Sequence, residues 1–282
     1  MNFNQDELFL PIKDYSVSKE NFELYRDTSL DLLATFPRPN EIDLPRYYES
    51  DDYISHTDGK RSVFENAYHF VKNIALKNKI HLIENLQPEK GKLLDIGAGT
   101  GDFLNAAKNS GWHVSGSEPN EKARNIAASK EVLLLENTAD FSDQSFDVIT
   151  MWHVLEHVPD PETQIRELKR LLKPKGKLIV AVPNFNSYDA KYYGGYWAAF
   201  DVPRHLWHFS KTAVSKLFAR ENMIVERILP MKFDSFYVSL LSEKYKTGRM
   251  NYPKALWIGL QSNIKGAKTG EYSSHIYIIA NK

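Results

Sequence analysis

The sequence predicts an α/β fold organised around a parallel sheet. Residues 92–96 are apolar apart from Lys92 and Asp95, as expected of a parallel strand that is covered on both faces. A glycine-rich turn at 97–101 follows, and an apolar face that begins at Phe103 indicates a helix directly after the turn. Two further apolar segments, 146–152 and 177–182, are separated by an amphipathic helical pattern. This alternation of strand and helix is typical of α/β proteins.

The composition narrows the class of protein. The 282 residues allow one large domain, or one domain with an appendage. The 36 basic residues balance the 36 acidic ones, so no overall field favours nucleic acid or an anionic membrane. The absence of cysteine excludes disulfides, thiolate metal ligands and a cysteine nucleophile. The polar N-terminus and the lack of a long apolar run predict a cytoplasmic enzyme without stable membrane insertion, either a monomer or a homodimer.

The glycine-rich turn indicates the chemistry of its ligand. Gly97, Gly99 and Gly101 let the backbone turn sharply and approach a ligand closely. The dinucleotide fingerprint would place a glycine at position 102, where this chain has Asp102. Together with Asp95, this carboxylate would repel a pyrophosphate at the helix N-terminus. The two acids suit a ligand without phosphate and with positive charge, and S-adenosylmethionine (SAM) carries both an ammonium and a sulfonium.

A third acidic residue, Glu118, lies where a ribose-binding carboxylate is expected. The segment 112–118 predicts a second strand that ends in Glu118, and Pro119 precedes the next helix. Glu118 lies 17 residues after Gly101, near the roughly 20 expected for a ribose-binding carboxylate. A carboxylate can accept hydrogen bonds from both ribose hydroxyls. The two motifs together predict a nucleoside-containing cofactor.

Four motifs in order and in spacing resemble a class I SAM-dependent methyltransferase of the ubiquinone-biosynthesis-like group (methyltransferase types 11, 12 and 23). The resemblance implies a Rossmann-like sheet of seven strands in the order 3-2-1-4-5-7-6, with strand 7 antiparallel. It covers about residues 60–230 well and the two ends less well. The motifs that carry it are Asp95-Ile96-Gly97-Ala98-Gly99-Thr100-Gly101, Glu118, Phe146-Asp147-Val148-Ile149 and Leu155-Glu156-His157-Val158.

Residues 1–60 form a separate small segment, and we assign 61–282 to the methyltransferase domain. Two short strands are predicted in the small segment, at 22–25 and 30–34. The segment resembles one that follows a four-cysteine zinc ribbon in a related methyltransferase subgroup. Because the cysteines are missing here, we interpret it as a metal-free remnant and predict no metal. Tyr53 and His56 could close over the methionine end of SAM, although a surface loop with packed tyrosines is the favoured alternative.

The remaining elements follow from periodicity. The run 132–135 is continuously apolar and predicts a strand that is central or covered on both faces. Apolar and aromatic residues recur at helical spacing over 233–245, and we interpret them as core packing. A lid that faces the substrate or a membrane is the alternative. In chain order the pattern predicts helices at 61–87, 120–130, 162–172 and 210–221, a short helix around Trp257, and strands at 146–152, 177–182, 223–229 and 275–280.

The resemblance implies further cofactor contacts. Adenine would lie beside Ala139, with its amino group facing Asp140, for which a turn aspartate is the alternative. Because ligands bind at the carboxyl ends of parallel strands, the end of strand 146–152 should line the site. The residues so predicted to bind the cofactor, besides the acids and glycines above, are Ala98, Phe103, Pro119, Ala139, Asp140, Met151, Trp152 and His153.

The connection at 184–209 is long and rich in aromatic residues, which is typical of a lid or binding loop. Its aromatic side chains would form an apolar surface for an acceptor, and Arg204 could hold an anionic group. The alternative is a packed loop whose arginine and histidines fix its backbone. The candidate substrate residues here are Tyr196, Trp197 and Arg204, and the candidate bases are His153, His157, His205 and His208.

The sequence therefore predicts a SAM-dependent methyltransferase, which yields S-adenosylhomocysteine and acts on an oxygen or nitrogen, less readily a carbon, of a small-molecule acceptor. Nothing in the sequence identifies that acceptor. A non-catalytic SAM-binding protein and a NAD-type oxidoreductase are the alternatives, and the glycine spacing with Asp102 opposes the second.

Overall fold

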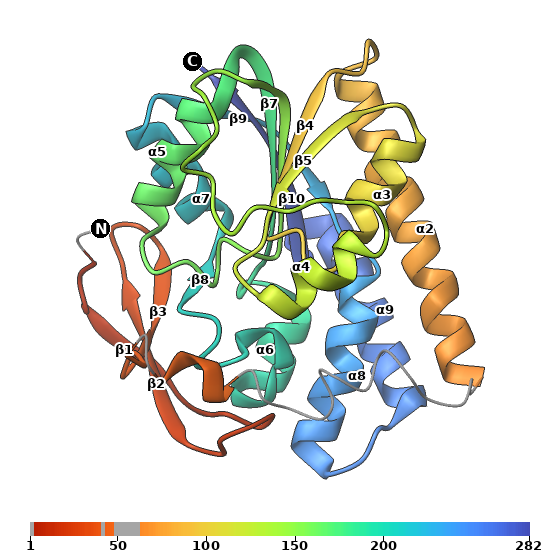
Figure 1. Ribbon diagram of the computed structural model, residues 1–282. Coiled ribbons are helices and arrows are strands. Elements are labelled where there is room, and N and C mark those ends of the chain that lie inside the picture. The colour runs from red at the N-terminus through yellow and green to blue at the C-terminus, as the bar shows by residue number, and fades with distance from the viewer. Residues whose placement is uncertain (1–2, 41–42, 48–62) are drawn as a thin grey trace.

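The computed structural model describes residues 3–40, 43–47 and 63–282, and its centre is a six-stranded sheet (Figure 1). The strands run in the order β5-β4-β6-β7-β10-β9. Strands β4 to β7 are parallel to one another, and β10 is antiparallel to both of its neighbours. The strand bounds are β4 Lys92–Ile96, β5 His113–Ser117, β6 Phe146–Trp152, β7 Leu172–Pro183, β9 Met223–Pro230 and β10 Ser274–Asn281.

Helices cover both faces of this sheet (Figure 1). Leu93 and Leu94 are both fully buried although they point to opposite faces, which confirms the expectation of a doubly covered strand. Leu94 packs in a cluster with α5 and α7, whereas Leu93 packs in a cluster with α2, α3 and α4. The helix bounds are α2 Val63–Leu86, α3 Asp102–Asn109, α4 Glu121–Ala128, α5 Pro161–Leu171 and α7 Lys211–Arg220.

The strand predicted at 132–135, third in chain order, is wrong. This segment makes one isolated parallel bridge, between Ser117 and Leu135, so the sheet of the described residues has six strands and not seven. Val132 and Leu134 pack inward against the sheet's helices, but Leu133 is 84% exposed. The segment lies at an edge with one face in solvent, and a continuous apolar run does not distinguish that position from a central one.

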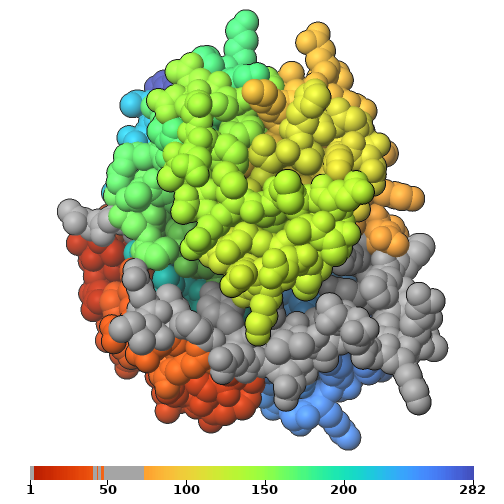
Figure 2. All heavy atoms as spheres, viewed as in Figure 1, coloured from red at the N-terminus to blue at the C-terminus, as the bar shows by residue number. Residues whose placement is uncertain are grey.

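The N-terminal residues form a second, antiparallel sheet that includes a strand from far along the chain. Its order is β1-β2-β3-β8, with β1 Glu7–Lys13, β2 Asn21–Asp27, β3 Leu32–Phe36 and β8 Trp207–Phe209. The two predicted strands exist, while β1 and the pairing with β8 were not predicted. Leu33 pairs with His208 in this sheet. In the space-filling view the N-terminal strands (red to orange) form the lower left of the visible surface (Figure 2).

The connection at 184–209 is folded rather than extended. It contains α6 Tyr188–Tyr193, η2 Gly194–Tyr196, η3 Ala198–Phe200 and β8, and the short helix η1 Leu44–Tyr47 precedes the main domain. Because β8 completes the N-terminal sheet, the connection and the N-terminal strands pack as one layer. The division of the chain at residue 60 stays a prediction.

Two helices, α8 Asp234–Thr247 and α9 Tyr252–Thr269, pack against each other (Figure 1). The buried face of α8 is formed mainly by small serines, with Ser235 donating to the carbonyl of Gly259 at 3.1 Å. The aromatic residues Phe233 and Tyr237 are 44% and 47% exposed, so the interpretation of their stripe as core packing is wrong for these two. Small residues form the interface between α8 and α9 because they let the two helix backbones approach closely. The helix around Trp257 spans 18 residues and is longer than predicted.

Candidate functional site

The glycine-rich turn connects β4 to α3 with a backbone that only glycine adopts readily. Gly97, Gly99 and Gly101 have φ values of 66°, 54° and 75°. A Cβ on Gly97 would lie 2.5 Å from the Val154 side chain, so this glycine also serves packing. A Cβ on Gly99 would meet none of the described residues within 4 Å. Among the described residues the backbone at Gly99 therefore faces open space, as a surface that a ligand approaches should.

Glu118 is held at the end of β5 by two backbone amides. The amide of Gly99 donates to its Oε2 at 2.9 Å, and the amide of Asn120 donates to its Oε1 at 2.9 Å. These bonds join the first turn to the end of the second strand, because β4 and β5 are adjacent and parallel. The side chain is thereby fixed beside the open backbone of Gly99, in the arrangement that the sequence predicts for ribose binding.

Asp95, the other predicted acid, is buried at the end of β4 with only 3% exposure. The Thr150 hydroxyl donates to its Oδ1 at 2.6 Å. Burial raises the pKa of Asp95 to about 7, against the lowering effects of the Thr150 hydrogen bond and the Lys79 charge. A carboxylate held at such a cost in free energy is more typical of a binding site than of a structural core.

Asp102 contributes less to ligand choice than the sequence predicts. Lys130 forms an ion pair with it at 2.6 Å, and the same ammonium donates to the Thr100 carbonyl at 2.8 Å. The pair offsets the negative charge of Asp102 at the helix N-terminus. Exclusion of a pyrophosphate therefore rests on Asp95 and Glu118 rather than on Asp102.

An aromatic wall with a lysine stands at the carboxyl end of β6. Trp152 packs edge-on against Phe103, with ring centroids 5.7 Å apart. The ammonium of Lys79, from α2, lies 4.2 Å from the Trp152 ring centroid. Burial lowers the pKa of Lys79, while Asp95 and Asp234 oppose that shift. Sequence reasoning missed Lys79, although a lysine within an apolar helical face was a usable signal.

The other predicted cofactor residues lie in varied surroundings. Met151 is fully buried in the cluster that contains Leu94 and Ile149, on the other face of the sheet from Trp152. Ala139 and Asp140 are exposed, and so is Pro119, whereas Ala98 packs partly against the α3 cluster. Ala139 and Asp140 follow Leu135, which makes the isolated β-bridge with Ser117, and their exposed side chains are accessible to a ligand. Their adenine role stays a prediction.

His153 is enclosed by two carboxylates. Its Nδ1 lies 3.2 Å from Glu156 Oε1 and its Nε2 lies 3.2 Å from Asp234 Oδ2. Burial favours the neutral ring, but the hydrogen bonds to Asp234 and Glu156 outweigh it and raise the pKa of His153 to about 10. A histidine that is protonated at neutral pH cannot accept a proton, so the predicted base role of His153 is not supported. Asp234 comes from α8, and no local pattern pointed to it.

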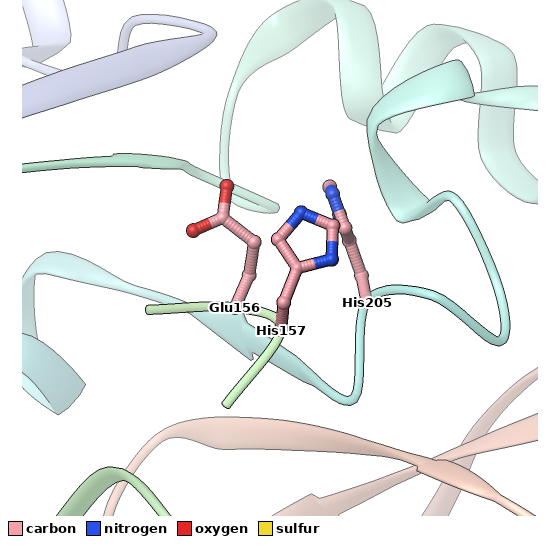
Figure 3. Close-up of side chains that lie close together, drawn as sticks. All are labelled: Glu156, His157 and His205. Carbon is pink, nitrogen blue, oxygen red and sulfur yellow. The ribbon is translucent and has the colours of Figure 1, made fainter. Parts of the chain in front are cut away.

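His157, His205 and Glu156 form a compact cluster next to His153 (Figure 3). One ligand atom from each of the three lies within 4.8 Å of the others. The Nδ1 groups of His157 and His205 donate to the carbonyls of Arg204 and Ala199, at 3.0 and 2.9 Å. Glu156 and His157 follow β6, and His205 comes from the 184–209 connection, so the fold brings together residues that are distant in sequence.

Burial and neighbouring charged groups together set the protonation states in this cluster. Burial and the neighbouring His205 lower the pKa of His157 to about 4, so the ring is neutral at neutral pH. Glu156 is 1% exposed, and its Oε2 has no hydrogen-bond partner among the residues that the structure describes. Although burial opposes it, the hydrogen bond from His153 lowers the pKa of Glu156, so the carboxylate is charged. Neutral imidazole with a buried carboxylate can relay a proton, and this donor set could also hold a divalent cation.

His208 is a structural residue. The Thr35 hydroxyl donates to the His205 carbonyl at 2.7 Å, so the Nε2–H of His208 donates to the Thr35 oxygen at 2.9 Å. Burial lowers the pKa of His208 well below its usual range. The ring is enclosed where β8 joins the N-terminal sheet, and its predicted base role is not supported.

The predicted anion-binding role of Arg204 is also not supported, because its side chain is fully engaged. It makes a two-pronged pair with Asp201, and it donates to the Tyr47 carbonyl at 2.7 Å and to the Ser16 hydroxyl at 2.6 Å. These contacts agree with the alternative stated for residues 184–209, a packed connection whose backbone is fixed by its arginine. It ties that connection to the N-terminal strands.

Of the two aromatic residues predicted to contact the acceptor, one is buried in the core and the other is exposed. Trp197 is 2% exposed, and its indole N–H donates to the buried Asp189 at 2.8 Å, so it belongs to the core. Tyr196 is 36% exposed and lies against Tyr15, with ring centroids 5.1 Å apart. Tyr53 and His56 lie outside the described residues, and their roles stay predictions.

Known proteins share both the sequence pattern and the fold. A family model described as methyltransferase domain matches residues 69–226, more than half of the chain. The ubiquinone biosynthesis O-methyltransferase of Coxiella burnetii is 34% identical over 128 residues, which are 41% of this chain and 55% of that protein. The enzyme of the same name from Idiomarina loihiensis is 32% identical over 105 residues, 34% of this chain and 43% of that protein. The chain thus spans about half the length of these curated relatives.

Solved structures share the fold. A SAM-dependent methyltransferase from Thermotoga maritima aligns with a TM-score of 0.52 and 24% identity, over 78% of this chain and 97% of that one. Magnesium protoporphyrin IX methyltransferase from Synechocystis, with bound S-adenosylhomocysteine, aligns with a TM-score of 0.57 and 13% identity, over 86% and 100%. At these identities the similarity establishes the Rossmann-like fold. Within the described residues, no helix combines the length and apolarity needed to cross a bilayer.

Proposed function

Because the chain belongs to the methyltransferase domain family, we propose that it transfers the methyl group of SAM to an oxygen atom of a small-molecule acceptor. The observation that carries the proposal is the position of Glu118, fixed by the Gly99 and Asn120 amides beside open backbone. Oxygen is favoured over nitrogen because the curated relatives are O-methyltransferases. We further propose a cytoplasmic protein, monomeric or dimeric, that does not act on nucleic acid.

Residues at the sheet's carboxyl edge, together with Lys79 from α2, would each contribute to cofactor binding. Glu118 would accept hydrogen bonds from the ribose hydroxyls, and Asp95 would face the positive end of SAM. A cation near Asp95 favours its charged form and so lowers the raised pKa on binding. The Lys79 ammonium, beside Trp152, would pair with the carboxylate of the methionine moiety. SAM brings an activated methyl group, so the protein mainly has to position an acceptor in line with it.

The proton of the acceptor would leave through the His157–His205–Glu156 cluster. Neutral His157 accepts the proton as the acceptor oxygen attacks, and the charged Glu156 stabilises the imidazolium that forms. His205 stands beside it, with ring centroids 4.6 Å apart. Among the histidines predicted as bases, His157 is the one that lies just beyond β6 with a ring that is neutral at neutral pH and can accept a proton.

Calorimetry with SAM, S-adenosylhomocysteine and NAD tests the cofactor assignment. We expect micromolar binding of SAM and its product and none of NAD. Glu118→Gln should weaken SAM binding at least tenfold. Glu136→Gln, which makes the same change at an exposed carboxylate, should leave SAM binding unchanged. NAD binding without SAM binding would favour an oxidoreductase. SAM binding without turnover across an acceptor screen would favour a non-catalytic SAM-binding protein.

A further inference from the structure

The outward face of α9 is apolar. The inward face packs on the protein through Ala255, Ile258, Gly259, Ser262 and Gly266, which are buried. The opposite side of the helix carries the residues that we call the α9 apolar face, which are Tyr252, Leu256, Trp257, Leu260 and Ile264. Leu256 and Trp257 are 58% and 59% exposed. An apolar stripe directed away from the core does not contribute to folding, and so it requires another explanation.

The chain around this face is strongly basic although the protein as a whole is neutral. Residues 244–270 contain no aspartate or glutamate and six basic residues: Lys244, Lys246, Arg249, Lys254, Lys265 and Lys268. Lys254 pairs with the buried Glu243 at 3.5 Å, and the Lys265 ammonium lies 3.6 Å from the Tyr188 ring centroid. The overall charge balance therefore hides a local positive field at α9.

We propose that the α9 apolar face is a docking surface for an anionic lipid bilayer. A helix with an apolar outer face and flanking lysines lies in the plane of the membrane interface, with its apolar side chains among the upper acyl chains. The rings of Trp257 and Tyr252 suit the headgroup level, where one end of a side chain is apolar and the other is wet. The lysines and Arg249 add attraction to anionic headgroups.

The basic residues around α9 favour an anionic bilayer over a second copy of the chain as the partner of the α9 apolar face. A two-fold dimer through α9 would place the same six basic residues of each copy around one interface, where they would repel. An anionic lipid surface complements both features of the helix at once. Attachment of this kind needs no membrane-spanning helix.

The docking surface adjoins the candidate site without depending on it. The Asn263 side chain, in α9, donates to the Lys232 carbonyl just before α8 at 2.9 Å. Next to it, Phe233 is 44% exposed, and the following residue, Asp234, contacts His153. Docking through α9 would thus place the carboxyl edge of the sheet near the bilayer. The proposal concerns lipid binding alone, and it can hold or fail whatever the protein methylates.

Vesicle co-sedimentation of the full chain tests the proposal. We expect binding to vesicles of phosphatidylcholine with about one-third phosphatidylglycerol, at least tenfold weaker binding to phosphatidylcholine alone, and loss of binding at high salt. Trp257→Gln with Leu260→Gln should reduce binding to the anionic vesicles at least tenfold. Arg249→Glu with Lys268→Glu should do the same while the apolar face stays intact.

The control places the same change on another exposed apolar surface. Ile224→Gln with Ile228→Gln, on β9, alters side chains that are 49% and 38% exposed, and it should leave vesicle binding unchanged. Circular dichroism confirms that each variant is folded. Absence of binding by the wild-type protein, or binding that survives the α9 changes, would overturn the proposal. So would a wild-type dimer, seen by sedimentation velocity, that the Trp257→Gln and Leu260→Gln changes convert to a monomer.

Discussion

Replacing Asp95 by asparagine should stabilise the unliganded protein and abolish SAM binding. The carboxyl is 3% exposed, and burial raises its pKa from 3.8 to about 7. Because the folded state disfavours the charged form, ionisation of Asp95 costs stability that an amide would not lose. An asparagine keeps the shape of the side chain and can still accept the hydrogen bond from Thr150.

The size and sign of the effect follow from the pKa shift. A shift of about 3 pKa units corresponds to about 4 kcal/mol. The destabilisation is absent below about pH 4, grows as the pH rises, and is complete above about pH 7. About 1.5 kcal/mol of this cost is already present at pH 5, because that pH lies above the unfolded pKa. The cost of burying an amide is the same at every pH, so we expect the stability difference between variant and wild type to rise by about 2.5 kcal/mol from pH 5 to pH 8.5.

Urea unfolding followed by circular dichroism at those two pH values measures the difference. Glu136→Gln serves as the exposed control and should show no such pH dependence. SAM should raise the unfolding midpoint of the wild type and not that of Asp95→Asn, because the variant lacks the charge that faces the cofactor. A stability difference that is equal at both pH values would refute the argument that burial raises the pKa of Asp95.

Three further predictions concern the turn, the base and the connection. Gly99→Val should abolish SAM binding seen by calorimetry and cost about 1–2 kcal/mol in unfolding, since the residue has a φ of 54° and its side chain would fill the open space; retained micromolar affinity would contradict the placement of the cofactor. His157→Ala should lower kcat about 100-fold or more with SAM affinity within threefold, and an equal loss in both would assign the ring a structural role. Arg204→Lys should lower the free energy of unfolding by about 1–3 kcal/mol, because lysine cannot reproduce the two-pronged pair with Asp201, while KM for the acceptor stays unchanged; a raised KM at unchanged stability would restore the anion-binding role.

Local sequence was enough to place the glycine-rich turn. The three glycines, the acid before them and Glu118 lie at the ends of two adjacent strands, and parallel pairing brings those ends together. The glycines are identifiable because left-handed backbone conformations are costly for other residues. The strands followed from local patterns and their order from the family resemblance, except at 132–135. There, a segment at the sheet's edge and a central strand share one apolar signature, and the exposure of Leu133 distinguishes them.

The roles of the histidines and of Arg204 were decided by contacts between distant parts of the chain. His153 is charged because Asp234 reaches it from α8, 81 residues later in the sequence. Arg204 is occupied because Tyr47 and Ser16, in the N-terminal region, face it. A side chain's chemistry depends on its burial and its partners, whereas periodicity reports only that a residue is buried. The sequence by itself therefore determined the fold class and the glycine-rich turn, and the tertiary structure decided which titratable groups are charged, neutral or already engaged by other side chains.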